Sequence, residues 1–280
     1  MPSAALPSLT GPTSVLESVL HAARDQGRTA LIGYLPSGFP HRTDSLSLLE
    51  AMAEGGVDVI ELGWPAQNPA LDGPVIRMAQ ETALRGGWRP DDLLRTTAAL
   101  AERGVPVLCM TYWRELRRYG TERFCARFSA AGGCGLVTPD APPEDVPGWA
   151  GALRAHGLDR VLLAPHGTGT ERLALLRSHG SGFAYVTASA GRTGDPRVVH
   201  DRVEQLTHRV RAALDLPVCV GVGLSTGPQV ARAARYADGV VVGTAFVRRV
   251  AEADDTLSAA RALRAFAREL SEAVRPPRTG

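Results

Sequence analysis

The chain has 280 residues and a formal net charge of +2, a length that supports one large domain or two small ones, with an ample hydrophobic core. This nearly balanced charge gives no electrostatic reason to expect a nucleic-acid partner or an anionic membrane surface. No apolar run approaches the roughly 18 residues of a transmembrane helix. Residues 1–13 lack the basic start and apolar core of a secretory signal, so we expect a cytoplasmic protein.

The basic residues of the chain are all arginines, because the sequence contains no lysine. Schiff-base chemistry and a covalently bound pyridoxal cofactor both need a lysine amine, so this polypeptide supports neither of them. A Walker-type phosphate loop is excluded for the same reason. The four cysteines form no CxxC pair. They therefore indicate buried free thiols in a reducing compartment rather than a zinc site.

Amphipathic and short apolar segments alternate along the chain. The first amphipathic segment precedes the first apolar run and predicts an extra N-terminal helix at 14–26. The apolar runs predict strands at 30–35, 57–62, 107–112, 135–138, 160–164, 183–187, 218–222 and 239–242. The other amphipathic segments predict helices at 43–53, 75–84, 90–102, 122–131, 143–156, 171–178, 198–214, 228–235 and 257–274.

The alternation of strands and helices implies a parallel sheet, and eight βα units in about 250 residues predict a (β/α)8 TIM barrel. The alternative is a doubly wound open sheet. The glycines at 221–223 resemble a dinucleotide loop, but they follow the seventh strand and lack the third glycine of that motif. We expect residues 1–280 to form a single domain with flexible tails at 1–13 and 275–280.

The second predicted strand carries the strongest candidate for chemistry. Glu61 lies between Ile60 and Leu62 near the end of this strand, and a carboxylate among apolar neighbours is costly to bury without a partner or a purpose. In a barrel, catalytic groups lie at the C-terminal ends of the strands. Asp72 follows in the next loop, where capping of a helix that starts near Gly73 explains it equally well.

Glycine-containing loops follow the last three predicted strands, at 191–194, 221–223 and 243–245. Each glycine taken singly is explained by a tight turn. Together, the loops lie where barrels commonly bind phosphate, and two of them precede short helical starts whose bare N–H groups favour an anion. The sequence therefore predicts a phosphate site formed by these loops.

Several short motifs between residues 31 and 247 occur together in one enzyme family. They are Glu61-Leu62-Gly63-x-Pro65, Leu71-Asp72-Gly73-Pro74-Val75-Ile76, Met110-Thr111-Tyr112, Arg118-Tyr119-Gly120-x-Glu122-Arg123-Phe124, Pro139-Asp140, Gly182-Phe183-x-Tyr185, Gly191-x-Thr193-Gly194 and Gly243-x-Ala245-Phe246-Val247. In this combination they resemble the tryptophan synthase alpha chain family. The resemblance implies retro-aldol cleavage of indole-3-glycerol phosphate to indole and glyceraldehyde 3-phosphate, without metal or organic cofactor.

The resemblance also implies a role for each matched residue. Glu61 matches the general acid/base of the family, which protonates indole C3 and helps to deprotonate the glycerol hydroxyl. Asp72 matches the carboxylate that accepts the indole N–H, and Tyr185 matches a tyrosine that lines the site near the catalytic glutamate. The other matches are phosphate contacts at Gly194, Gly223, Gly243 and Thr244, the last at a position that is usually serine, and loop closure at Thr193.

Some positions depart from the pattern of the family. The family usually has Pro-x-Ser-Asp-Pro where this chain has Ala66, Gln67 and Asn68 between two prolines, and the aspartate at the third of these positions helps the alpha chain communicate with a beta chain. Arg114-Glu115 replaces an Asn-Pro pair, and the loop at 166–169, with His166, is unusual. Arg192 replaces an apolar residue and is expected to contact the phosphate or to close the sixth loop.

Three functional hypotheses therefore remain open at this point. The first is an alpha chain that feeds indole to a beta chain, and the second is a self-sufficient lyase that supplies free indole to another pathway. The third is a non-catalytic barrel that binds a phosphate ligand and regulates a partner. Intact Glu61 and Asp72 argue against the third hypothesis, and the altered segment 66–68 favours the second over the first.

Overall fold

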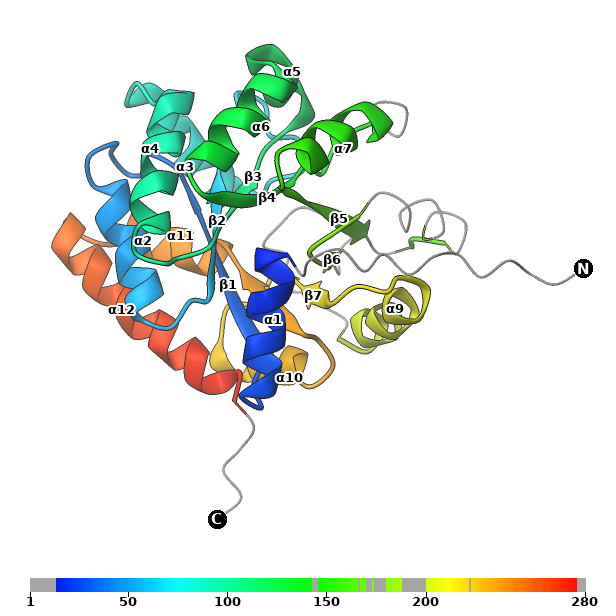
Figure 1. Ribbon diagram of the computed structural model, residues 1–280. Coiled ribbons are helices and arrows are strands. Elements are labelled where there is room, and N and C mark those ends of the chain that lie inside the picture. The colour runs from blue at the N-terminus through cyan, green and yellow to red at the C-terminus, as the bar shows by residue number, and fades with distance from the viewer. Residues whose placement is uncertain are drawn as a thin grey trace, which may run out of the picture.

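The computed structural model describes residues 14–142, 146–165, 167–169, 173, 180–187, 200–221 and 223–275. Its strands pair in parallel in chain order, and β8 pairs with β1, so that the sheet closes on itself (Figure 1). The strands are β1 (Ala30–Pro36), β2 (Val59–Gly63), β3 (Val107–Met110), β4 (Gly133–Val137), β5 (Asp159–Pro165), β6 (Ala184–Thr187), β7 (Val218–Val220) and β8 (Gly239–Val242). The predicted (β/α)8 TIM barrel is confirmed, and the open sheet is wrong.

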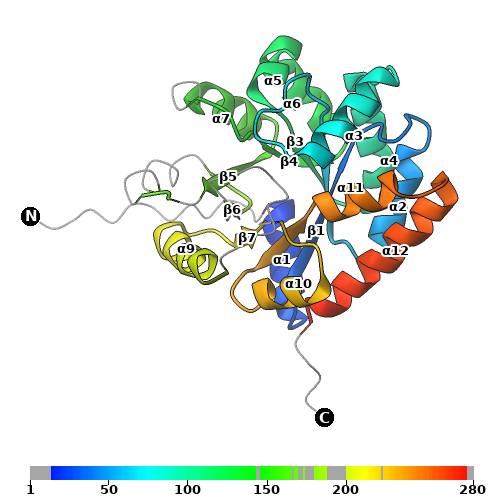
Figure 2. The ribbon, with the colours of Figure 1, turned by 180° about the vertical axis from the view of Figure 1, so that it is seen from behind.

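Helices surround this barrel, and α12 lies beside α2 where the ring of helices closes (Figure 2). They are α1 (Val15–Asp25), α2 (Ser45–Glu54), α3 (Pro74–Arg85), α4 (Pro90–Ala101), α5 (Trp113–Tyr119), α6 (Thr121–Ala130), α7 (Val146–Ala155), α9 (His200–Ala213), α10 (Gly227–Ala234), α11 (Thr244–Ala251) and α12 (Thr256–Ala273). No helix among the described residues has the length and apolar character needed to cross a membrane.

Most predicted boundaries agree with the observed elements to within two residues, but one short helix, α5, was not predicted. The third strand ends at Met110 rather than at residue 112, because α5 begins at Trp113. The seven residues of α5 are too few to show a clear helical period. The helix α11 follows β8 after a single residue, Gly243, where the sequence predicted a short helical start. The predicted helix at 171–178 lies outside the described residues, apart from residue 173.

The helix α1 closes the barrel at the N-terminal ends of its strands and confirms the predicted extra helix. Ser14 caps it, because the Ser14 hydroxyl accepts a hydrogen bond from the backbone N–H of Glu17. Leu16 and Leu20 are buried in the same cluster as the inward-facing residues Ile32, Val59, Leu108, Cys134, Val137, Val161, Phe183, Cys219 and Val241. A ligand must therefore reach the barrel interior from the opposite, C-terminal end.

Strand alternation places the two acids of the second strand region in different surroundings. Val59 belongs to the interior cluster, so Glu61, two residues later, also points into the barrel. Asp58 instead forms a bidentate ion pair with the Arg28 guanidinium, at 2.7 and 2.8 Å, and accepts the backbone N–H of Leu31. Asp58 is thus a structural residue, and Glu61 is the acid that faces the open end of the barrel.

The single domain and the flexible tails stay predictions. Residues 1–13 and 276–280 lie outside the described residues.

Candidate active site

Glu61 lies at the C-terminal end of β2 with its side chain only 3% exposed. Among the described residues, its carboxyl group has no hydrogen-bond partner, and the only charge that acts on it is the neighbouring carboxylate of Asp72. Burial, and to a smaller extent Asp72, raise the pKa of Glu61 from 4.5 to about 8. The group is therefore a carboxylic acid at neutral pH and can donate a proton.

Asp72 lies in the loop between β2 and α3 and is also 3% exposed. Its Oδ2 accepts hydrogen bonds from Gln80 Nε2 at 2.8 Å and from the Tyr112 hydroxyl at 2.9 Å. Burial raises the pKa of Asp72, whereas these two donors lower it by favouring the charged form. The helix-cap interpretation of Asp72 is wrong, because Gly73 occupies the N-cap of α3 and no side chain caps that helix.

Two tyrosines flank Glu61 from other strands of the barrel. Tyr34 on β1 is paired in register with Glu61, and Tyr185 on β6 reaches the same interior. Burial raises the pKa of both hydroxyls, and the carboxylates of Glu61 and Asp72 raise it further. The Tyr185 hydroxyl lies so close to Gly221 that a Cβ at that position would approach it to 2.4 Å. The structure therefore brings Tyr185 to Glu61 and adds Tyr34, which the motifs did not indicate.

The predicted phosphate residues that the structure describes follow two neighbouring strands, β7 and β8. Gly223 has a φ of +68°, a left-handed conformation that favours glycine. Gly243 is the N-cap of α11, and the backbone N–H groups of Thr244 and Ala245 have no acceptor among the described residues. Such N–H groups at a helix N-terminus attract an anion. Other residues with a predicted role lie outside the described part of the chain: Arg192, Thr193 and Gly194. His166, in the unusual loop at 166–169, lies outside it as well.

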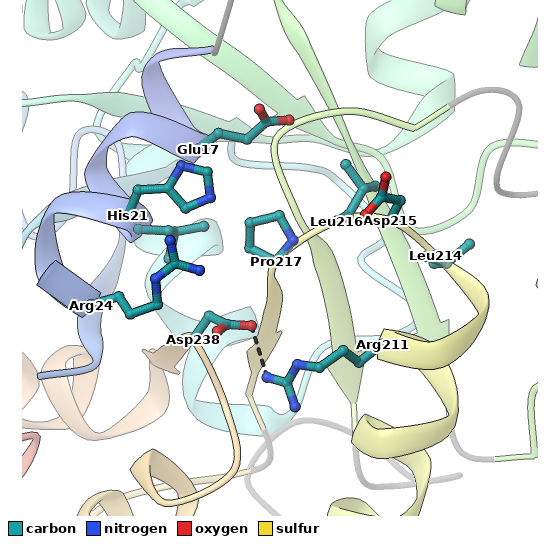
Figure 3. Close-up of a pocket in the computed structure, with 10 residues that line it drawn as sticks. Glu17, His21, Arg24, Arg211, Leu214, Asp215, Leu216, Pro217 and Asp238 are labelled. Carbon is teal, nitrogen blue, oxygen red and sulfur yellow. Dashed lines mark hydrogen bonds and ion pairs between the residues drawn. The ribbon is translucent and has the colours of Figure 1, made fainter. Parts of the chain in front are cut away.

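A separate pocket of about 320 Å³ lies at the N-terminal end of the barrel (Figure 3). Glu17, His21 and Arg24 of α1 line one side of it, and an ion pair of 2.8 Å joins Arg211 and Asp238 on the other side. Its lining therefore carries charges of both signs and includes neither Glu61 nor Asp72. This pocket is distinct from the candidate active site.

No group of three or more histidine, cysteine, aspartate or glutamate side chains within the described ranges is arranged to hold a metal ion. The four cysteines are buried free thiols, as the sequence predicted. Burial keeps the pKa of each thiol above its usual range, so none of them is a reactive thiolate.

Two further residues of the site carried no predicted role. Tyr112 belongs to one of the family motifs, and its hydroxyl accepts the backbone N–H of Leu71 while it donates to Asp72. Gln80 is a polar residue within the buried stripe of α3, and this break in an otherwise apolar stripe was the signal available in the sequence. Both residues hold Asp72 in place.

Comparison with known proteins agrees with this geometry. The sequence pattern of the family described as tryptophan synthase alpha chain matches residues 20–275. The tryptophan synthase alpha chain of Streptomyces avermitilis is 44% identical over 262 residues, which are 93% of this chain and 95% of that protein. A structure of Mycobacterium tuberculosis tryptophan synthase is similar with a TM-score of 0.88 at 40% identity, over 95% of this chain and 100% of that chain. A crystal structure of the alpha subunit from Legionella pneumophila has a TM-score of 0.85 at 27% identity, over 94% and 98% of the two chains. The chain therefore belongs to the tryptophan synthase alpha chain family, the lyases of indole-3-glycerol phosphate.

Proposed function

We propose that Glu61 and Asp72 carry the cleavage of indole-3-glycerol phosphate at the C-terminal end of the barrel. The observation that supports this assignment is the contrast between the two buried carboxyl groups. Glu61 has no hydrogen-bond donor in the described part of the chain and a pKa of about 8, whereas Asp72 is held by two donors that favour its charged form. Two carboxyl groups in unlike surroundings are suited to separate roles, one as proton donor and the other as a fixed anion.

The reaction breaks the bond between indole C3 and the glycerol chain. Glu61 donates its proton to C3, which places positive charge on the indole nitrogen, and the N–H of that nitrogen donates to the Asp72 carboxylate. Ionised Glu61 then accepts the proton of the hydroxyl on the carbon next to C3. The O–H electrons form the carbonyl of glyceraldehyde 3-phosphate, and the electrons of the broken C–C bond return to the ring to give neutral indole. Glu61 is protonated again at the end of the cycle.

The other site residues hold the substrate in this scheme. Tyr185 contacts the reacting part near Glu61, and the phosphate binds to the N–H groups around Gly223, Gly243 and Thr244. Gly194 contributes a further contact, and Thr193 and Arg192 close the sixth loop over the substrate. Because the N–H groups around Gly243 and Thr244 belong to the backbone at the start of α11, they are oriented before the phosphate arrives.

The phosphate position is tested by comparing Gly243→Asp with Gly243→Asn. The two side chains have nearly the same shape, and either one would place its Cβ 3.3 Å from the ring and the Cβ of Tyr34, but only aspartate adds a negative charge. We expect Gly243→Asp to raise the KM for indole-3-glycerol phosphate at least about tenfold above that of Gly243→Asn. Equal KM values in the two variants, together with unchanged binding of glycerol 3-phosphate, would place the phosphate elsewhere.

We further propose that the chain works with a tryptophan synthase beta chain. Similarity to named alpha chains over almost the whole length disfavours the self-sufficient lyase and the regulatory barrel. Of the three departures in segment 66–68, Ala66 is only 2% exposed, so its side chain makes no partner contact. Gln67 and Asn68 are exposed, and Asn68 offers no charge to a cationic group of a partner.

The test of the function is indole release from indole-3-glycerol phosphate across a titration of beta chain. We expect the isolated chain to release indole and to respond weakly to the beta chain, and Asn68→Asp to increase that response by roughly one order of magnitude. The double variant Asn68→Asp with Gln67→Ser extends the comparison. No indole release at any beta-chain concentration would contradict the proposed function, and strong activation of the unmodified chain would contradict the weakened coupling.

A further inference from the structure

Gln80 is a buried amide inside the apolar face of α3. Its side chain is 1% exposed and lies among Ile76, Ala79 and Ala83, the other buried residues of that helix. Its Oε1 accepts the backbone N–H of Ala66 at 2.9 Å, and its Nε2 donates to Asp72 Oδ2 at 2.8 Å. An amide at such a position is destabilising unless its polar atoms are paired, so these two bonds account for its presence.

The orientation of this amide is dictated by its neighbours. A backbone N–H can only donate, so the group that faces Ala66 must be Oε1. The NH2 group of Gln80 must then face Asp72, and a flipped amide would lose both bonds. Gln80 is therefore a fixed N–H donor aimed at one oxygen of the carboxylate.

The second donor to Asp72 meets the same oxygen. The Tyr112 hydroxyl donates to Oδ2, so this atom accepts two hydrogen bonds. Asp72 Oδ1 accepts none from the described residues. The carboxylate is thus anchored through one oxygen and presents the other, which is the arrangement that a fixed acceptor for a substrate N–H requires.

Gln80 also ties together the two ends of the loop between β2 and α3. Ala66 begins the segment 66–72 and Asp72 ends it, and the residues between them include the exposed Gln67, Asn68 and Leu71. A displacement of the exposed part that moved Ala66 would move the amide and, through it, the carboxylate. Gln80 therefore couples Ala66, at the start of the segment, to the acceptor at its end.

We propose that Gln80 is a positioning residue that presents Asp72 Oδ1 to the indole N–H and makes this presentation depend on the position of segment 66–72. The inference rests on the proposed role of Asp72 as the acceptor of that N–H. Gln80 itself does not touch the substrate in this scheme. It acts by holding the acceptor and by linking it to the exposed loop.

Several titratable groups surround the amide. Asp72 is its direct partner, the Tyr112 hydroxyl shares that partner from the segment after β3, and the Tyr34 hydroxyl faces Gln80 from β1. Glu61 on β2 lies beyond Asp72, and Arg77 on α3 supplies the cation that acts on Asp72. The amide is therefore the uncharged donor within a group of acidic side chains, and an acid in its place would face Asp72 directly.

The decisive variant is Gln80→Glu. The introduced carboxyl keeps the length of the side chain and an acceptor for the Ala66 N–H, but its ionised form replaces the donor by an oxygen that repels Asp72. Its protonated form can donate again. We expect kcat/KM for indole release to be about ten- to a hundredfold below that of the unmodified chain at pH 8. The ratio of kcat/KM in Gln80→Glu to kcat/KM in the unmodified chain should approach one as the pH falls towards 5.

Two matched variants separate positioning from packing. Gln80→Met keeps the volume but removes both hydrogen bonds, so its loss of activity should not recover at low pH. Glu81→Gln changes an exposed neighbour on the same helix and should leave the pH profile unchanged. If the ratio of kcat/KM in Gln80→Glu to kcat/KM in the unmodified chain stayed constant between pH 5 and 9, with both proteins folded, the inference would be overturned.

Binding of 3-indolepropanol phosphate, an analogue that lacks the reacting hydroxyl, is measured over the same pH range. If the unmodified chain released no indole, the proposed function would fail, and the analogue would decide the role of Gln80 alone. A pH-dependent loss of analogue affinity in Gln80→Glu would support the positioning role in that case. Affinity that is equal in the two proteins at every pH would overturn it.

Discussion

Glu61→Gln is expected to lower indole release by roughly 10²–10⁴-fold, the loss typical of a removed general acid/base. Glutamine keeps the shape of the side chain but has no titratable proton. Because the pKa of Glu61 is raised to about 8 in the ligand-free chain, kcat/KM of the unmodified chain should fall as the pH rises through that value and the acid ionises. The residual activity of Glu61→Gln should lack this alkaline limb. The measurement is kcat/KM for indole release between pH 6 and 10.

The stability of the same variant provides its control. The pKa of Glu61 is about 8 in the folded chain and near 4.5 in the unfolded chain, so the folded state binds more protons between these values. The contribution of protonated Glu61 to the free energy of unfolding is fully present below pH 4.5 and is lost as the pH rises through 8. Glutamine carries no such dependence, so Glu61→Gln should gain Tm relative to the unmodified chain between pH 6 and 9. A folded variant with near-normal turnover would contradict the mechanism.

Asp72→Asn is expected to lower kcat by roughly 10²–10³-fold, a loss comparable to that of other fixed groups that stabilise charge in a transition state. Asparagine can still accept a hydrogen bond from the indole N–H, but it carries no negative charge to stabilise the positive charge that protonation of C3 creates. The loss should therefore fall on kcat more than on KM. Both parameters are measured by indole release with saturating and limiting substrate.

Tyr112→Phe is the matched control for Asp72→Asn. It removes one of the two hydrogen bonds to Oδ2 but leaves the charge of Asp72 in place. Its effect on kcat should be much smaller, about tenfold, which is the size of one hydrogen bond to a charged group. Similar losses in the two variants would show that the anchoring of the loop, rather than the charge of Asp72, limits the reaction.

The architecture of this protein was determined by local features of its sequence. Short apolar runs that alternate with amphipathic segments specify strands and helices through contacts near in the chain, and eight such units favour a parallel barrel. The pairing of β8 with β1 then distinguishes the closed barrel from a doubly wound open sheet. Glu61 could be identified in the same way, because an acid inside an apolar strand is visible in five residues of sequence. The short helix α5 was not predicted, because its seven residues span only about two turns.

The surroundings of Asp72 were decided only by the tertiary structure. In the sequence, an aspartate before a glycine and a proline is as well explained by a helix cap, and the two donors that hold its carboxylate lie 8 and 40 residues away. Gln80 reaches Asp72 from two turns along α3, and the Tyr112 hydroxyl reaches it from the end of a neighbouring strand. Burial and hydrogen bonding depend on which elements meet in the barrel. Gln80 lies near Asp72 in the sequence, but no local pattern shows that its amide turns back to the carboxylate, and Tyr112 joins them only when β2 and β3 pair in the barrel.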